Sequence, residues 1–185
     1  MTSAVKMLAS GFAVIVGAAL LAGMMLTNPS YDRALRPFVT DAAAQTKGET
    51  RSFRATFTGW ETAQTITFAA FGRTTTRSTG GIFLITAVMV EGVHSSTRLS
   101  AVWAGASGRL YHETPRIRDL AQQLPELWAQ PGLESRAIAI FELPPDEVQG
   151  GALLLSLPLD PRLDGKLRLA PPADPPSHQS ERIFP

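Results

Sequence analysis

The stretch Ile82-Phe-Leu-Ile-Thr-Ala-Val-Met-Val90 is apolar at nearly every position and rich in β-branched and aromatic side chains. An alternating pattern would predict a strand with one face in water. A continuous apolar run bounded by turn residues instead predicts a strand covered on both faces. We therefore expect residues 82–90 to form the central strand of the fold.

The sequence around this run predicts further strands. In residues 51–58 the apolar side chains of Phe53, Ala55 and Phe57 alternate with polar ones, a pattern typical of a half-buried strand. Gly59-Trp60 interrupts the alternation before it resumes. The further expected strands are residues 65–68, 99–103, 109–112, 137–141, 152–157 and 166–169. Seven or eight short strands with turn signals between them predict an all-β fold, a β-sandwich.

Two segments between these strands have different patterns. Residues 73–81 are polar and end in glycine, so we expect a loop. Thr114-Pro115 has the residue types of a helix start, with an N-cap followed by proline. Ile117, Leu120 and Leu124 would share one face of the helix that follows. We therefore expect one short amphipathic helix at residues 116–124.

Residues 7–26 form an uncharged, mostly apolar run of twenty residues. As a helix this run would be about 30 Å long, which matches the hydrocarbon core of a bilayer. We expect a single transmembrane signal-anchor after a short flank at residues 1–6, with the C-terminal domain outside the cytoplasm. A cleaved signal peptide and a buried soluble helix remain alternatives, although no clean Ala-x-Ala cleavage site follows the run.

Small residues recur at four-residue spacing within this run, at Ala9, Ala13 and Gly17. Such a stripe lets two membrane helices approach closely, so it is a candidate packing face. An Ala/Gly-rich segment also produces this spacing by chance.

The predicted organisation has five parts: residues 1–6, 7–26, a linker at 27–48, a β-sandwich domain at 49–169, and a tail at 170–185. From Pro158 onward the sequence holds seven of the fourteen prolines of the chain. Polyproline-like or disordered structure is therefore expected for the tail.

The segment Thr50–Leu157 resembles a family of bacterial extracytoplasmic domains with an immunoglobulin-like fold. This family has no known function and is sometimes mislabelled as telomeric repeat-binding. The likeness lies in residues 81–91 (a glycine and a long strand), 101–111 (a strand, a Gly turn and an aromatic return) and 130–144 (a Pro-Gly turn and a strand ending in proline). The resemblance implies an Ig-like β-sandwich at the bacterial cytoplasmic membrane, and it supplies no catalytic residue. The family commonly has Asn after the long strand, where this chain has Glu91-Gly92, and its members are often lipoproteins, which this chain without cysteine is not.

Composition argues against several classes of function. Without residues 1–26 the chain has 16 basic and 16 acidic side chains, so we expect no nucleic-acid binding, which requires excess positive charge. With no cysteine there is no thiolate metal site or disulfide. His94, His112 and Glu113 are the only weak metal-site candidates, and no Gly-x-Ser-x-Gly nucleophile motif occurs. We therefore predict a protein that is not an enzyme and has no cofactor or metal.

The resulting hypothesis is a non-enzymatic, membrane-anchored interaction module that contacts another bacterial envelope protein. Its possible partner contacts are Trp60, Trp128 and Tyr111. Trp60 and Trp128 fall at breaks between strands, where an aromatic ring either covers the core or anchors a partner, and Tyr111 is a possible stacking ring. The alternative is a secreted β-sandwich that binds a ligand or glycan by stacking on these rings.

Overall fold

The computed structural model of the chain describes residues 2–27, 37–70, 72–118, 120, 122–158 and 164–184. The chain divides into two compact units, Met1–Arg36 and Pro37–Pro185. Each unit is described by itself below.

The first unit contains the helix α1 (Thr2–Thr27). Its many Ala, Leu and Met residues have strong helix propensity, which explains why this segment is helical. The prediction of a transmembrane helix at residues 7–26 needs correction. Across the described part of the chain, no helix combines the length and the apolar character that crossing a bilayer requires.

Within the described residues, the second unit is built almost entirely from strands. Their bounds are β1 (Phe38–Ala42), β2 (Gly48–Glu49), β3 (Phe53–Ala70), β4 (Arg73–Gly92), β5 (Ser100–Ala104), β6 (Leu110–His112), β7 (Ser135–Leu143), β8 (Ala152–Ser156), β9 (Gly165–Leu169) and β10 (Ser177–Phe184). Two short 3₁₀-helices, η1 (Leu124–Glu126) and η2 (Pro145–Glu147), lie between them.

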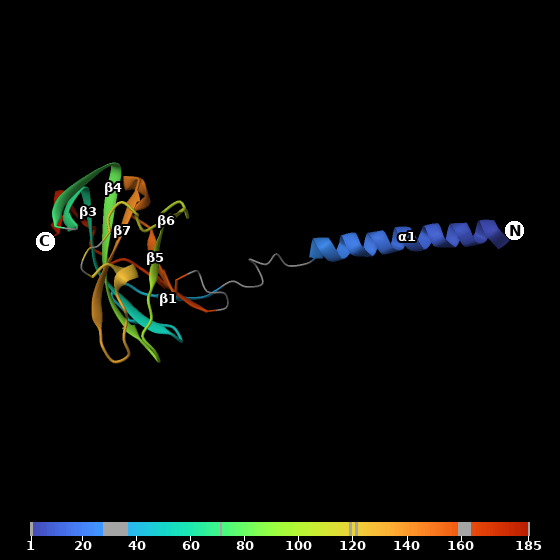
Figure 1. The fold of residues 1–185 in the computed structure, drawn as a ribbon, viewed down its shortest axis with the longest axis horizontal. Coiled ribbons are helices and arrows are strands. Elements are labelled where there is room, and N and C mark those ends of the chain that lie inside the picture. The colour runs from blue at the N-terminus through green and yellow to red at the C-terminus, as the bar shows by residue number, and fades with distance from the viewer. Residues whose placement is uncertain are drawn as a thin grey trace. The chain divides into compact units, whose positions relative to one another are not determined.

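The strands form two sheets (Figure 1). The first has the order β1-β9-β8-β5-β6, and the second has the order β10-β3-β4-β7, with β2 paired to β3. Most neighbours are antiparallel, but β1 pairs in parallel with β9 and β10 pairs in parallel with β3. The predicted β-sandwich is confirmed, but the prediction of seven or eight short strands is wrong, because the described residues form ten strands, of which β3 and β4 are long.

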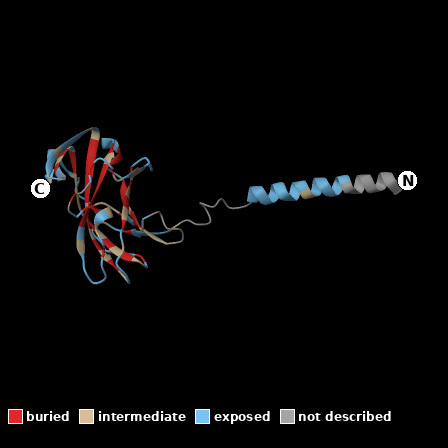
Figure 2. Cartoon of the chain, viewed as in Figure 1, coloured by how far each residue is buried: buried red, intermediate tan, exposed pale blue. Residues whose placement is uncertain are grey.

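The inner faces of the two sheets enclose the main core. Trp103 of β5 is fully buried at its centre, and its ring contacts those of Phe57, Trp60 and Phe141 at centroid distances of 6.0–6.4 Å. These are the ordinary separations of edge-to-face and tilted aromatic pairs. The buried residues therefore follow the central strands and β7, whereas the edge strands β1, β6 and β10 are mostly exposed (Figure 2).

A second apolar cluster lies on the outer face of the β10-β3-β4-β7 sheet. Leu84 of β4 points into the main core, whereas its neighbours Phe83 and Ile85 belong to the outer cluster, because side chains alternate along a strand. Ile117 and Leu120, from the segment between β6 and β7, cover part of this outer face. The prediction that residues 82–90 form a strand is thus confirmed. Both faces are covered at Phe83–Ile85, whereas Ala87 and Met89 on the outer face are only partly buried.

The predicted loop at residues 73–81 is part of β4, so this expectation is wrong. Strands β3 and β4 form one long hairpin whose register runs from Phe53↔Gly92 to Ala70↔Arg73. The threonine-rich part of the hairpin is exposed on most positions, and side-chain hydrogen bonds such as Thr67–Thr76 (2.8 Å) join its strands. Threonine is β-branched and favours strands, so a polar sequence here is compatible with a long, exposed hairpin.

The amphipathic helix expected at residues 116–124 is not formed by the described residues there; Asp119 and Ala121 lie outside the description. Gln122 has a backbone φ of 69°, which lies outside the helical region and ends any helical path. Only the 3₁₀-helix η1 follows, and it starts at Leu124. The apolar pattern nevertheless identifies buried residues correctly, because Ile117, Leu120 and Leu124 all lie inside the protein.

Both ends of the second unit contain strands where a linker and a disordered tail are expected from the sequence. Strands β1 and β2 lie within or at the end of the predicted linker, residues 27–48, and β10 lies within the predicted tail, residues 170–185. Strand β10 is anchored by contacts with β3 that are remote in sequence, including the hydrogen bond from Thr67 to Glu181 (2.7 Å). Because these contacts are remote in sequence, the proline-rich residues 170–185 contain no local pattern that predicts the strand.

Candidate functional site

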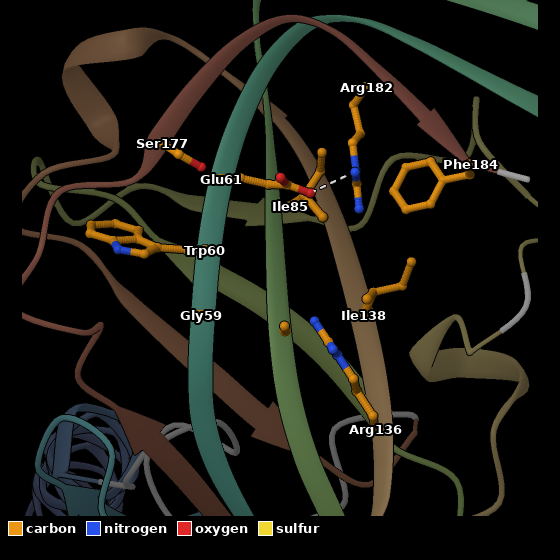
Figure 3. A pocket seen from close by; sticks show the side chains of 10 residues that line it. Gly59, Trp60, Glu61, Ile85, Arg136, Ile138, Ser177, Arg182 and Phe184 are labelled. Atoms are coloured by element: carbon orange, nitrogen blue, oxygen red, sulfur yellow. Dashed lines mark ion pairs between the residues drawn. The ribbon is translucent and has the colours of Figure 1, made fainter.

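The outer face of the β10-β3-β4-β7 sheet carries a groove, named the outer groove below (Figure 3). It has a volume of about 240 Å³ and draws on all four strands of the sheet. Its lining residues are Gly59, Trp60, Glu61, Ile85, Ala87, Arg136, Ile138, Ser177, Arg182 and Phe184.

The floor of the groove exists because two very small residues face each other. Gly59 of β3 and Ala87 of β4 are direct cross-strand partners, next to a register irregularity between Phe57 and Gly59. A Cβ atom at Gly59 would meet nothing within 4 Å, so the space above the sheet is open at this point. Ile85 and Ile138 continue the floor with apolar surface.

An ion pair closes one end of the groove. The Nε atom of Arg182 lies 2.9 Å from Oε1 of Glu61, an ionic contact without the alignment of a hydrogen bond. The other carboxylate oxygen of Glu61 accepts a hydrogen bond of 3.1 Å from Nε2 of Gln179. The guanidinium of Arg182 also lies over the ring of Phe184, 5.1 Å from its centroid. Glu61 is therefore already engaged within the protein.

A second arginine enters the groove from the opposite end. Figure 3 shows the side chain of Arg136 running from β7 into the groove, while Arg182 points toward Ile85 from β10. No ion pair or hydrogen bond joins the Arg136 side chain to any other described residue. The groove thus combines an apolar floor with one uncompensated positive charge.

Two of the three predicted aromatic contacts have internal roles. The ring of Trp60 packs against the main core, and its Nε1 donates a hydrogen bond of 2.8 Å to the carbonyl oxygen of Asp174. Tyr111 is half-buried against the same core. Trp128 is different, because it is 51% exposed and the guanidinium of Arg98 lies 4.9 Å from its ring centroid. The three rings therefore do not share one exposed surface.

The predicted helix-packing stripe is only partly described. The side chain of Ala9 lies outside the described residues, Ala13 is exposed, and Gly17 is half-exposed with no atom within 4 Å of the position a Cβ would take. Within the first unit, the described part of the stripe therefore contacts no other segment.

The weak metal candidates do not form a cluster. His94 and His112 are exposed, whereas the carboxyl of Glu113 turns inward and accepts a hydrogen bond of 3.2 Å from the backbone N–H of Ala101. Burial raises the pKa of Glu113 to about 8, more than this hydrogen bond lowers it. Among the described residues, no group of three His, Asp or Glu side chains is arranged to hold a metal ion.

A wider hollow of about 470 Å³ lies where β4 and β7 end, beside Gly80, Gly81 and Pro144. Its one carboxylate, Glu142, accepts hydrogen bonds from Thr79 (2.6 Å) and Arg116 (2.8 Å). Burial raises the pKa of Glu142, but these hydrogen bonds and the charge of Arg116 outweigh it and hold the pKa below its ordinary value. This carboxylate is neutralised within the protein, so the hollow presents less unsatisfied chemistry than the outer groove.

The sequence patterns do not reveal the outer groove. Gly59 stands out only as an interruption of a strand, and Arg136 and Arg182 belong to no motif. The groove depends on the pairing of β10 with β3, which places Arg182 beside Glu61 although the two residues are far apart in the chain. The small residue in an otherwise regular strand is the one usable signal, because glycine inside a strand often marks a bulge or an open space.

Comparison with known proteins yields structural similarity alone. No family model and no curated protein sequence matches the chain. An uncharacterized β-sandwich protein from Clostridium difficile is similar with a TM-score of 0.45 and 9% identity, over 72% of this chain and 95% of that one. The yjhA protein from Bacillus subtilis is similar with a TM-score of 0.48 and 9% identity, over 69% of this chain and 99% of that one. A conserved hypothetical protein from Bacillus anthracis has a TM-score of 0.40 and 8% identity, over 66% and 93%.

Proposed function

We propose that this chain is a non-catalytic accessory module that binds a partner protein through the outer groove. The observation that carries the proposal is the unpartnered guanidinium of Arg136, among the described residues, in a hollow with an apolar floor. An exposed guanidinium above a small apolar floor adds little to the stability of the isolated protein, because water solvates the charge and the floor isoleucines are already largely buried. Both are the usual ingredients of a small binding anchor, a few polar groups converging on an apolar pocket.

The arrangement favours binding over catalysis. A general acid or base must be free to exchange a proton, and the carboxylate in the groove, Glu61, is held by Arg182 and Gln179. Ser177 is the one hydroxyl-bearing residue that lines the groove, and no histidine lines it. The lining residues therefore offer no base–nucleophile pair.

Filling the groove tests this proposal. The variant Ala87→Phe places a ring over the Gly59 position, whereas Ala106→Phe places the same ring at an exposed turn of the other sheet and serves as the control. Affinity purification of the full chain from its native cells should recover a stoichiometric partner with the wild type and with Ala106→Phe, but not with Ala87→Phe. The proposal is wrong if Ala87→Phe retains the partner, or if the wild type recovers none and stays monomeric.

The immunoglobulin-like family and an extracytoplasmic location are part of the same proposal. Their support is the resemblance carried by residues 81–91, 101–111 and 130–144. Fusion of alkaline phosphatase after residue 185 should give an active enzyme, which folds only outside the bacterial cytoplasm, while a β-galactosidase fusion should be inactive. The reverse pattern would place the domain in the cytoplasm.

A further inference from the structure

We infer that the outer groove binds an acidic side chain of its partner polypeptide, together with an apolar side chain next to it. This inference rests on the proposed function and adds the chemistry that the partner must present. It follows from the charge, the size and the openness of the groove.

The charges of the groove select an anion. Two guanidinium groups, of Arg136 and Arg182, and one carboxylate, of Glu61, line it, so the lining has a net positive charge. Glu61 lies against Arg182 and accepts from Gln179, which leaves Arg136 without a counter-ion among the described residues. A carboxylate is the complementary group, because its two oxygens match the paired N–H groups of a guanidinium.

The floor selects an apolar neighbour for that carboxylate. Ala87, with the small exposed parts of Ile85 (3%) and Ile138 (9%), forms an apolar floor beneath the two arginines, and Gly59 leaves open space above the sheet. A methyl or methylene group placed here removes apolar area from water without displacing any protein hydrogen bond. The ligand must therefore carry its acid and its apolar group close together.

The size of the groove favours a side chain of a polypeptide over a free small acid. At about 240 Å³ the groove is below the range of about 300–1,000 Å³ in which sites enclose most of a small ligand. It lies on the face of a sheet, so a free acid would keep much of its surface in water. A side chain that belongs to a larger contact surface does not depend on the groove alone for its affinity.

A random peptide library tests the inference while the partner is still unidentified. The fluorescently labelled full chain is screened against random heptapeptides attached to beads by their C-termini, so that every free carboxylate comes from a side chain. The sequences that the wild type selects should contain Asp or Glu next to an apolar residue. Their affinity should fall about tenfold for Arg136→Gln, a typical loss for one charge-assisted hydrogen bond. The affinity should be unchanged for Arg168→Gln, an exposed arginine on β9 of the other sheet.

Each other outcome contradicts the inference in a recognisable way. The groove does not recognise a carboxylate if the wild type selects no peptide or selects peptides without acidic residues. Equal binding by Arg136→Gln would lead to the same conclusion. Displacement of the peptide by glutarate at a concentration equal to the peptide Kd would show that a free acid is the ligand. If Ala87→Phe loses the native partner while Arg136→Gln keeps it, the proposed function stands and only the acidic assignment fails.

Discussion

The indole Nε1 of Trp103 donates a hydrogen bond of 2.9 Å to the backbone carbonyl oxygen of Glu147. The bond joins the centre of the main core to the 3₁₀-helix η2, and it satisfies a polar group of a fully buried ring. Because Trp103 also contacts three other aromatic rings, one side chain connects strands of both sheets.

Replacing Trp103 should therefore cost much stability. Trp103→Phe leaves a cavity and removes the donor to Glu147, so we expect the free energy of unfolding to fall by about 2–4 kcal/mol. Urea denaturation followed by circular dichroism measures this change. The control is Trp128→Phe, which alters a half-exposed ring and should change the free energy by less than about 0.5 kcal/mol. Equal midpoints for the two variants would show that Trp103 does not hold the sheets together.

Gly151 is required by the same indole. A Cβ atom at position 151 would lie 2.5 Å from Cζ2 of Trp103, so Gly151→Ala must displace the ring or the backbone. We expect a loss of about 1–3 kcal/mol, typical of an overpacked core. Gly80→Ala is the matched control, because nothing lies within 4 Å of its Cβ position. Thermal unfolding of the two variants is compared side by side, and a Gly151→Ala protein as stable as Gly80→Ala would contradict this expectation.

Glu113 should make the stability depend on pH. Its pKa is raised from 4.5 to about 8 by burial, so between these values the folded protein binds more protons at this site than the unfolded chain. The contribution of Glu113 to the free energy of unfolding is therefore fully present below about pH 4.5, and it is lost as the pH rises toward 8.

Denaturation at several pH values tests this dependence. Glu113→Gln cannot ionise, so its unfolding free energy should vary less between about pH 5 and 8 than that of the wild type. Glu126→Gln, an exchange at an exposed position, should leave the slope unchanged. An identical slope for the wild type and Glu113→Gln would mean that Glu113 ionises freely in the folded protein.

The last two residues of β10 should differ in their contribution to stability. Phe184 packs against the outer cluster and beneath Arg182, whereas the neighbouring Ile183 is 62% exposed. We expect Phe184→Ala to lower the free energy of unfolding by about 1–2 kcal/mol and Ile183→Ala to change it by less than about 0.5 kcal/mol. Hydrogen exchange at the amides of β10 gives a second measurement, with faster exchange in Phe184→Ala alone. Unchanged exchange there would show that Phe184 does not anchor the strand.

The sequence predicts those parts of the fold whose signal is local. The apolar run at residues 82–90 and the alternation at Phe53, Ala55 and Phe57 identify central strands and their inner faces, as burial confirms, although the outer face of the run is buried only at Phe83 and Ile85. These patterns work because a strand in a sandwich must bury every second side chain, or all of them if both faces are covered.

Features that depend on distant partners are not predictable in this way. The strand Ser177–Phe184 lacks regular alternation and follows two Pro-Pro pairs, so its own sequence favours disorder. Its structure comes from β3, whose residues Glu61 and Thr67 hold Arg182 and Glu181. The candidate site cannot be predicted from local sequence for the same reason, because β10 supplies part of the lining of the outer groove.

The parallel pairing of β10 with β3 has a consequence for biosynthesis. Phe184 pairs with Phe68, and Ser177 with Glu61, so a large part of the chain separates the partners. Such non-local contacts form late, after the intervening chain has been made. While the ribosome is still translating the intervening residues, the edge of β3 that will pair with β10 has free backbone N–H and C=O groups. A nascent chain that stalls at this point would be prone to pair along this edge with a neighbouring chain on the same polysome.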